Sequence, residues 1–124
     1  MPAASDQNSF KSNCQDQVDI WRDSDQASLS IVIPVYNEAE NIPRLVAAVH
    51  DAMETHAGAW ELVIVNDGST DATWDELKTA QRKYGMHLRI FELNRNFGQT
   101  AALQAGLDQA RGEIVATMDG DLQN

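Results

Sequence analysis

Cysteine and basic residues are both scarce in this sequence. Cys14 is the only cysteine, which excludes an intrachain disulfide and favours a reducing compartment. Nine Lys and Arg stand against 19 Asp and Glu, so the formal net charge is −10 at pH 7. Proteins that bind nucleic acid neutralise its phosphates with an excess of Lys and Arg, and we therefore expect no nucleic-acid partner.

Long apolar runs are also missing. No run approaches the roughly 18 residues that a membrane-spanning helix needs. The first residues have neither the basic region nor the apolar core of a secretory signal. We expect a cytoplasmic location, at the cytoplasmic face of the membrane if a longer parent protein carries C-terminal membrane helices.

Two glycine motifs that hold phosphates are absent from the sequence. A Gly-x-Gly-x-x-Gly fingerprint does not follow the first predicted strand, which lowers the case for NAD or FAD. The Gly-x-x-x-x-Gly-Lys loop is absent too, which disfavours an NTPase of that type. With 124 residues, of which 43% are hydrophobic, the chain has room for one domain or part of one.

The chain divides into a polar tail and a patterned domain. Residues 1–27 are rich in Ser, Asp, Gln and Asn, a composition that buries too little apolar surface to offset the loss of chain entropy. We expect this segment to be a disordered or weakly ordered tail. Trp21 within it either docks on the domain or is exposed.

Strand and helix patterns alternate from residue 29 onward. Four apolar runs predict strands at residues 29–34, 60–65, 88–93 and 113–118. Three segments with helical spacing predict helices at 41–56, 72–84 and 99–111, with Asn41 and Asp71 capping the first two. Near-continuous Val, Ile and Leu in the first, second and fourth strands is typical of parallel strands covered on both faces. The order predicts an α/β fold with a Rossmann-like, open, mostly parallel sheet flanked by helices.

Each predicted strand is followed by a polar cluster, at residues 34–38, 66–71, 94–98 and 119–123. In open parallel sheets, ligands bind outside the carboxyl ends of the strands. Four clusters that converge on that edge predict one site. Taken singly, a cluster such as Asn-Asp-Gly-Ser at 66–69 is also good turn chemistry.

Two carboxylates end the last predicted strand. Asp119 and Asp121 are separated only by Gly120, so both can reach neighbouring points of one ligand. A hard divalent cation that carries phosphates is the natural ligand, because Mg²⁺ or Mn²⁺ takes one or two carboxylates and completes its shell with phosphate and water oxygens.

The clusters after the second and third strands suit a nucleotide diphosphate. Asp67 is an acceptor-only side chain for a base N–H or a ribose hydroxyl. Gly68 allows close approach of the backbone. Arg95 either meets phosphate oxygens or forms a structural ion pair.

The cluster after the first strand adds three further candidates. Tyr36 either stacks on a planar base or packs against its loop. Asn37 and Glu38 can reach ribose or base edges, and Glu38 can equally cap the first helix.

Four segments together resemble the family 2 glycosyltransferases of GT-A fold. They are Ile-Val-Ile-Pro-Val-Tyr-Asn-Glu at 31–38, Val-Asn-Asp-Gly-Ser-Thr-Asp at 65–71, Asn-Arg-Asn-Phe-Gly at 94–98 and Met-Asp-Gly-Asp-Leu-Gln-Asn at 118–124. The resemblance covers residues 29–124. It is closest to the bacterial branch similar to dolichyl- and undecaprenyl-phosphate sugar transferases.

This resemblance implies a UDP- or GDP-sugar donor, Mg²⁺ or Mn²⁺ as cofactor and, in the full-length protein, a lipid-phosphate acceptor such as a polyprenyl phosphate. The metal of the DXD motif would be held by Asp121 and Gln123. The implied nucleotide-sugar site comprises Pro34, Tyr36, Asn37, Glu38, Asp67, Gly68, Ser69, Arg95 and Asp119. The implied reaction is a single displacement with inversion at the anomeric carbon, in cell-envelope glycan or lipid glycosylation.

In the family, acceptor-side groups and any catalytic base follow the Asp-x-Asp motif. We therefore expect residues 29–124 to be the nucleotide-sugar-binding half of a GT-A domain, with catalytic residues beyond residue 124 and no transfer by this chain alone. The alternative is a non-catalytic nucleotide-sugar-binding module or an inactive fragment. A response-regulator-like signalling domain is disfavoured, because no acidic pair closes the first strand and no lysine follows a late strand end.

Overall fold

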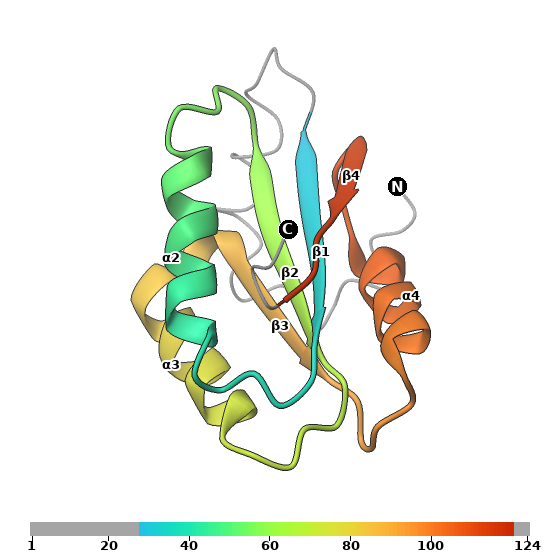
Figure 1. Ribbon diagram of the computed structural model, residues 1–124. Coiled ribbons are helices and arrows are strands. Elements are labelled where there is room, and N and C mark those ends of the chain that lie inside the picture. Colours follow the sequence, from blue (N-terminus) through green and yellow to red (C-terminus); the bar gives the residue numbers. More distant parts are fainter. Residues whose placement is uncertain (1–27, 121–124) are drawn as a thin grey trace, which may run out of the picture.

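The computed structural model describes residues 28–120, and the tail expected at residues 1–27 lies outside them (Figure 1). The strands are β1 (Leu29–Val35), β2 (Trp60–Asn66), β3 (Leu88–Glu92) and β4 (Ile114–Thr117). The helices are α2 (Ile42–Met53), α3 (Thr73–Tyr84) and α4 (Gln99–Gln109), and a short 3-10 helix, η2 (Gly85–His87), follows α3.

The sheet is parallel throughout, in the order β3-β2-β1-β4. In the middle of the sheet, Leu29 of β1 lies opposite Trp60 of β2 and opposite Ile114 of β4. The predicted α/β class and the predicted order of elements are therefore confirmed. β1 and β2, and likewise β2 and β3, are connected through one helix and lie side by side, whereas the connection through α4 carries the chain from β3 to β4 at the opposite edge of the sheet.

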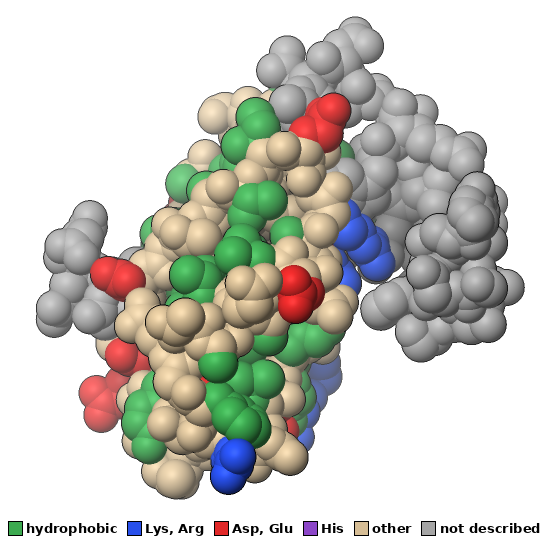
Figure 2. Space-filling view, turned by 90° about the vertical axis from the view of Figure 1, so that its right-hand side faces the viewer, with side chains coloured by type: hydrophobic (Ala, Val, Ile, Leu, Met, Phe, Trp, Pro, Cys, Tyr) green, Lys and Arg blue, Asp and Glu red, His purple; other side chains and the backbone are tan. Residues whose placement is uncertain are grey.

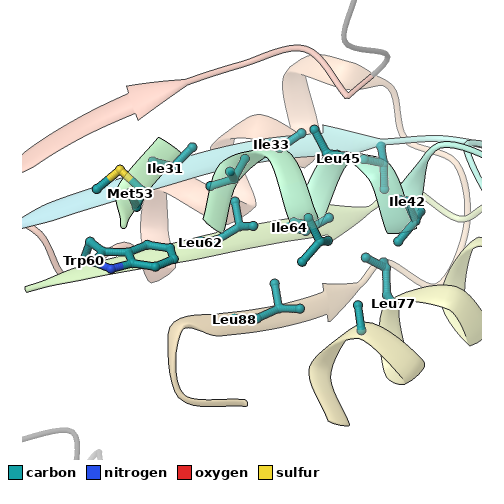
Figure 3. Close-up of a cluster of buried hydrophobic side chains, with 14 residues drawn as sticks. Ile31, Ile33, Ile42, Leu45, Met53, Trp60, Leu62, Ile64, Leu77 and Leu88 are labelled. Carbon is teal, nitrogen blue, oxygen red and sulfur yellow. The ribbon is translucent and has the colours of Figure 1, made fainter. Parts of the chain in front are cut away.

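Helices cover the two faces of the sheet unequally. Figure 1 shows α2 and α3 on one face and α4 on the other. Successive side chains of a strand point to opposite faces, so Ile31 and Ile33 join the α2–α3 core, whereas Val32 packs against the α4 side. Figure 3 shows the larger core, where Leu45 of α2 and Leu77 of α3 meet the strand side chains. No helix within residues 28–120 is long and apolar enough to cross a membrane.

The prediction that the fourth strand is covered on both faces is wrong. All four residues of β4 are exposed, with Ile114 54% and Val115 40% accessible. β4 lies at the edge of the sheet, and within residues 28–120 it pairs on one side only, with β1. Figure 2 shows apolar side chains at the surface on the side of α4 and β4.

A buried polar network closes the sheet at the amino ends of its strands. The carboxylate of Glu61, which is 2% exposed, accepts hydrogen bonds from Ser30 Oγ at 2.6 Å and from the Arg111 amide at 2.8 Å. Arg89 on β3 completes the set with an Nη1 contact to Glu61 at 2.8 Å. α4 ends at Gln109 and not at residue 111 as predicted. Ala110 is already extended, because the chain must leave the helix for the Arg111 amide to reach Glu61.

Candidate functional site

The carboxyl ends of the strands and the loops that follow them enclose a pocket of about 390 Å³. That volume is in the range of small-molecule sites. The pocket is lined by Pro34, Val35, Tyr36, Glu38, Asp67, Asn96, Gly98, Gln99, Asp119 and Gly120. Each of the four predicted polar clusters contributes to this lining, so the structure brings them to one place.

The cluster after β1 forms one wall of the pocket. Tyr36 is 44% exposed, so its ring is available to a planar ligand. Glu38 also anchors the start of α2, because its carbonyl accepts the amides of Asn41 and Ile42. The side chain of Asn41, predicted to cap α2, makes no cap hydrogen bond and instead donates Nδ2 to Glu38 Oε1 at 2.7 Å. Glu38 therefore lines the pocket and also contacts the start of α2.

Asp67 lines the pocket and is only 3% exposed. Its Oδ1 accepts the Phe97 amide at 2.8 Å, and its Oδ2 accepts the Gly98 amide at 3.0 Å. Asn96 Nδ2 lies 3.1 Å from the same Oδ2 and 3.1 Å from the Asp67 carbonyl. Both carboxylate oxygens are thus engaged by the segment between β3 and α4.

Gly68 and Arg95 are neighbours, but neither lines the pocket. Gly68 has a φ of +65°, and a Cβ there would lie 2.1 Å from the Arg95 carbonyl carbon. The close approach that this glycine permits is therefore made by the protein's own backbone. The guanidinium of Arg95 lies 4.5 Å from the centre of the Phe97 ring, and the ion pairs within residues 28–120 do not include Arg95.

Asn37 and Ser69 join two loops and do not line the pocket. The Asn37 amide donates to Ser69 Oγ at 2.9 Å, and the Thr70 amide donates to Asn37 Oδ1 at 2.8 Å. Asn37 adopts a φ of 52°, a left-handed conformation that asparagine tolerates better than most residues. These contacts tie the loop after β1 to the loop after β2, which holds the pocket wall in place.

Asp71 strengthens the same junction. Because α3 begins at Thr73, Asp71 precedes the N-cap residue, yet its carboxylate still accepts the Thr73 amide at 2.9 Å and the Ala39 amide at 3.3 Å. Desolvation raises the pKa of Asp71, but hydrogen bonds from Thr73 and Ala39 outweigh it and hold the pKa below its usual value. Asp71 therefore stays ionised at neutral pH and bridges the two loops.

The end of β4 supplies the acidic part of the pocket. Asp119 and Gly120 line it, whereas Asp121 and Gln123 lie outside the described residues. Within residues 28–120, no group of three or more His, Cys, Asp or Glu side chains could hold a metal ion. Carboxylate oxygens such as those of Asp119 and Glu38 are nevertheless the ligands that a hard cation prefers. Asp119 is exposed, so it can bind a cation that keeps part of its own hydration shell.

Sequence reasoning missed five residues of the lining. Asn96, Gly98 and Gly120 belong to motifs that had been singled out, although they were not named as site residues. Val35 looked like a core residue, and it is indeed 2% exposed. Gln99 is the first residue of α4, and its contribution depends on where the preceding segment places that helix.

Comparisons with known proteins give matches over this region. The family model described as "Glycosyl transferase family 2" matches residues 30–124. A "Dodecaprenyl-phosphate galacturonate synthase" from Rhizobium johnstonii is 54% identical over 96 residues, covering 77% of this chain and 28% of the relative. An "Undecaprenyl-phosphate 4-deoxy-4-formamido-L-arabinose transferase" from Salmonella choleraesuis is 41% identical over 96 residues, covering 77% and 29%. The chain thus spans under a third of the length of these curated relatives.

Solved structures share the fold over the same region. A mannosyltransferase, PcManGT from Pyrobaculum calidifontis in complex with GDP-Man and Mn²⁺, superposes with a TM-score of 0.70 at 27% identity, covering 77% of this chain and 28% of that one. TarS from S. aureus in complex with UDP-GlcNAc superposes with a TM-score of 0.62 at 29% identity, covering 76% and 26%. Residues 28–120 therefore have the architecture of a GT-A glycosyltransferase.

Proposed function

The chain belongs to glycosyl transferase family 2, and we propose that it is the donor-binding part of a metal-dependent, inverting glycosyltransferase. The donor is a UDP- or GDP-sugar, and the acceptor is a polyprenyl phosphate. The single observation that carries this proposal is the pocket at the carboxyl edge of the sheet, to which all four polar clusters contribute. The nucleotide sugars named with the two structural neighbours support the donor class.

The lining of the pocket offers different groups to the different parts of a nucleotide sugar. Tyr36 presents an exposed ring to the planar base, and Glu38 offers a carboxylate oxygen to ribose hydroxyls. Asp119 brings a second carboxylate to the lining from the end of β4, the strand that pairs with β1. The lining thus offers both a planar group and charged groups to a nucleotide sugar.

Asp119, with Asp121 and Gln123, is proposed to hold Mg²⁺ or Mn²⁺. When bound, the cation would stabilise the negative charge on the diphosphate leaving group. Mn²⁺ accompanies the donor in the PcManGT complex, which supports a divalent cation here. A carboxylate pair without bound cation would repel a diphosphate, so nucleotide binding should depend on the metal.

The curated relatives, whose names specify dodecaprenyl and undecaprenyl phosphate, support the proposed acceptor. A phosphate acceptor is already anionic, so it needs no strong general base for attack on the anomeric carbon. We place the reaction at the cytoplasmic face of the membrane. The second candidate is a nucleotide-sugar-binding module that does not catalyse transfer by itself.

Calorimetry with UDP and with GDP tests the proposal on the 124-residue chain. We expect at least one of them to bind in Mn²⁺ and to lose about tenfold or more in affinity in EDTA. Equal affinity in Mn²⁺ and EDTA would contradict metal-dependent binding. A parallel assay of radiolabelled sugar transfer to a polyprenyl phosphate tests whether this chain catalyses transfer by itself, because a labelled lipid would exclude the non-catalytic module.

A further inference from the structure

We infer that Asn37 is a positioning residue: its backbone conformation, fixed by contacts with residues 69–73, sets where Tyr36 and Glu38 line the pocket. The importance of Asn37 for binding rests on the proposed function, in which these two neighbours meet the base and the ribose of the donor. The conformation itself can be measured without a ligand.

The backbone at Asn37 is unusual. Within residues 28–120, Asn37 is the only residue other than glycine with a positive φ, at 52°. Such a conformation disfavours most side chains, and it persists where surrounding contacts enforce it, commonly at functional sites. Tyr36 and Glu38 both line the pocket, whereas Asn37 between them does not. The unusual backbone therefore lies between two pocket residues without being part of the lining.

Three consecutive backbone amides after β1 are held by side chains of the loop after β2. The amide of Asn37 donates to Ser69 Oγ at 2.9 Å, that of Glu38 to Thr73 Oγ1 at 2.9 Å and that of Ala39 to Asp71 Oδ2 at 3.3 Å. In the opposite direction, the Thr70 amide donates to Asn37 Oδ1 at 2.8 Å. Contacts between distant parts of the sequence thus set the path of the chain after β1.

Ser69 is fixed in turn by a buried residue of the sheet. Asn66 ends β2 and is 0% exposed, and its Oδ1 accepts both the amide and the hydroxyl of Ser69. Asn66 Nδ2 donates to Glu92 Oε2 on β3 at 3.2 Å. A hydroxyl carries one donor and two acceptor lone pairs, so Ser69 can donate to Asn66 and accept from Asn37 at once. Asn37 is therefore connected to the core of the sheet.

The conformation of residue 37 should control the affinity of the pocket. A ligand that needs one conformation binds more weakly in proportion to the fraction of the chain that adopts it. Glycine adopts a positive φ without strain, whereas the Cβ of alanine disfavours it. Asn37→Gly and Asn37→Ala both lack the carboxamide, so their comparison isolates the backbone conformation from the hydrogen bond to Thr70.

Calorimetry and NMR amide exchange on the 124-residue chain make this comparison. We expect the affinity for UDP or GDP in Mn²⁺ to be about fivefold or more lower in N37A than in N37G, because alanine is strained at this position. The protection factor of the Glu38 amide, which corrects for intrinsic exchange rates, should fall by a similar factor. The amide of Val63 in the central sheet should keep its protection in both variants.

Glu40→Gly and Glu40→Ala form the matched control pair. Glu40 follows in the same loop, is exposed, does not line the pocket and has no positive φ. Alanine there should support nucleotide affinity and Glu38 protection at least as well as glycine does. Equal affinity or equal Glu38 protection in N37G and N37A would overturn the inference. The same preference for glycine at residue 40, or an equal loss of protection at Val63, would overturn it too.

The wild-type chain decides the matter if N37A does not fold. Cross-correlated NMR relaxation distinguishes positive from negative φ, and we expect a positive φ at Asn37, near 52°. A negative φ there would contradict the inference. Failure of wild type to bind both UDP and GDP would instead contradict the proposed function, and it would leave the measured φ and the exchange comparison intact.

Discussion

The guanidinium of Arg89 lies 2.8 Å from the carboxylate of Glu61, and their side chains are only 11% and 3% exposed. Glu61 lies on β2 and Arg89 on the adjacent strand β3. Arg89 is opposite Val63, which is two residues after Glu61. The pair is the charged part of the network that joins the amino ends of the sheet to the chain after α4.

Removing the cation from this pair should be strongly destabilising. Arg89→Met keeps an apolar stem but leaves Glu61 with an uncompensated buried charge, and we expect a loss of about 3 kcal/mol in the free energy of unfolding. Urea denaturation measures it. Lys78→Met is the matched control, because the Lys78–Asp75 pair at 3.6 Å has side chains 47% and 77% exposed and should contribute under about 1 kcal/mol. Equal losses in the two variants would show that burial of the pair is unimportant.

Alanine at Gly68 should destabilise the chain more than alanine at Gly85. Both glycines have a positive φ, 65° and 58°, so alanine is strained at each position. A Cβ at Gly68 meets the Arg95 backbone at 2.1 Å, whereas a Cβ at Gly85 meets nothing within 4 Å. Thermal melting should therefore give a lower Tm for G68A than for G85A. Equal Tm values would mean that the loop of residues 94–98 can move away from the added Cβ at little cost in free energy.

The stability of the fold should decline as the pH falls below about 6.5, in part because of His50. Burial lowers the pKa of His50, and His87 adds to that effect, against a smaller opposing influence of the Val46 carbonyl and Asp51. Nδ1 lies 2.9 Å from the Val46 carbonyl, whereas Nε2 is buried without a hydrogen-bond partner. The unfolded chain therefore takes up a proton at higher pH than the folded chain does, and this favours unfolding.

The comparison of wild type with His50→Gln between pH 7.5 and 5.5 checks this assignment. The stability advantage of wild type over the variant should shrink as the pH falls, and it should level off below the folded pKa of His50. An advantage that stays constant or grows toward pH 5.5 would assign the pH dependence to other groups.

Loss of either aspartate of the DXD motif should weaken metal-dependent nucleotide binding. For Asp121→Asn and Asp119→Asn, we expect the affinity for UDP or GDP in Mn²⁺ to fall about tenfold or more, because each change removes a charge that attracts the cation. Asp108→Asn on α4 is a control of equal charge change away from the pocket, and it should bind like wild type. If D121N responded to Mn²⁺ as wild type does, the metal ligand would lie elsewhere.

The sequence by itself determined the order of the elements and the edge of the sheet at which the site lies. Apolar runs and helical spacing are local properties, so β1 and β2 were predicted to within one residue at their ends. The position of the site followed from the same information, because every parallel strand delivers its carboxyl end to one edge. The resemblance to family 2 glycosyltransferases implied Pro34, Tyr36, Glu38, Asp67 and Asp119 as site residues, and all five line the pocket.

Only the tertiary structure decided which polar side chains face the pocket and which face the protein. A polar residue or a glycine in a loop has the same chemistry whether it contacts a ligand or another part of the protein. The protein contacts that the structure shows join residues about 30 positions apart in the chain: Asp67 with Asn96, Gly68 with Arg95, and Asn37 with Ser69. The composition of β4 did not reveal its exposure, because an apolar run has the same composition at the edge of a sheet as at its centre. Hydrogen-bond partners and strand neighbours are set by long-range packing, and a local pattern carries no record of them.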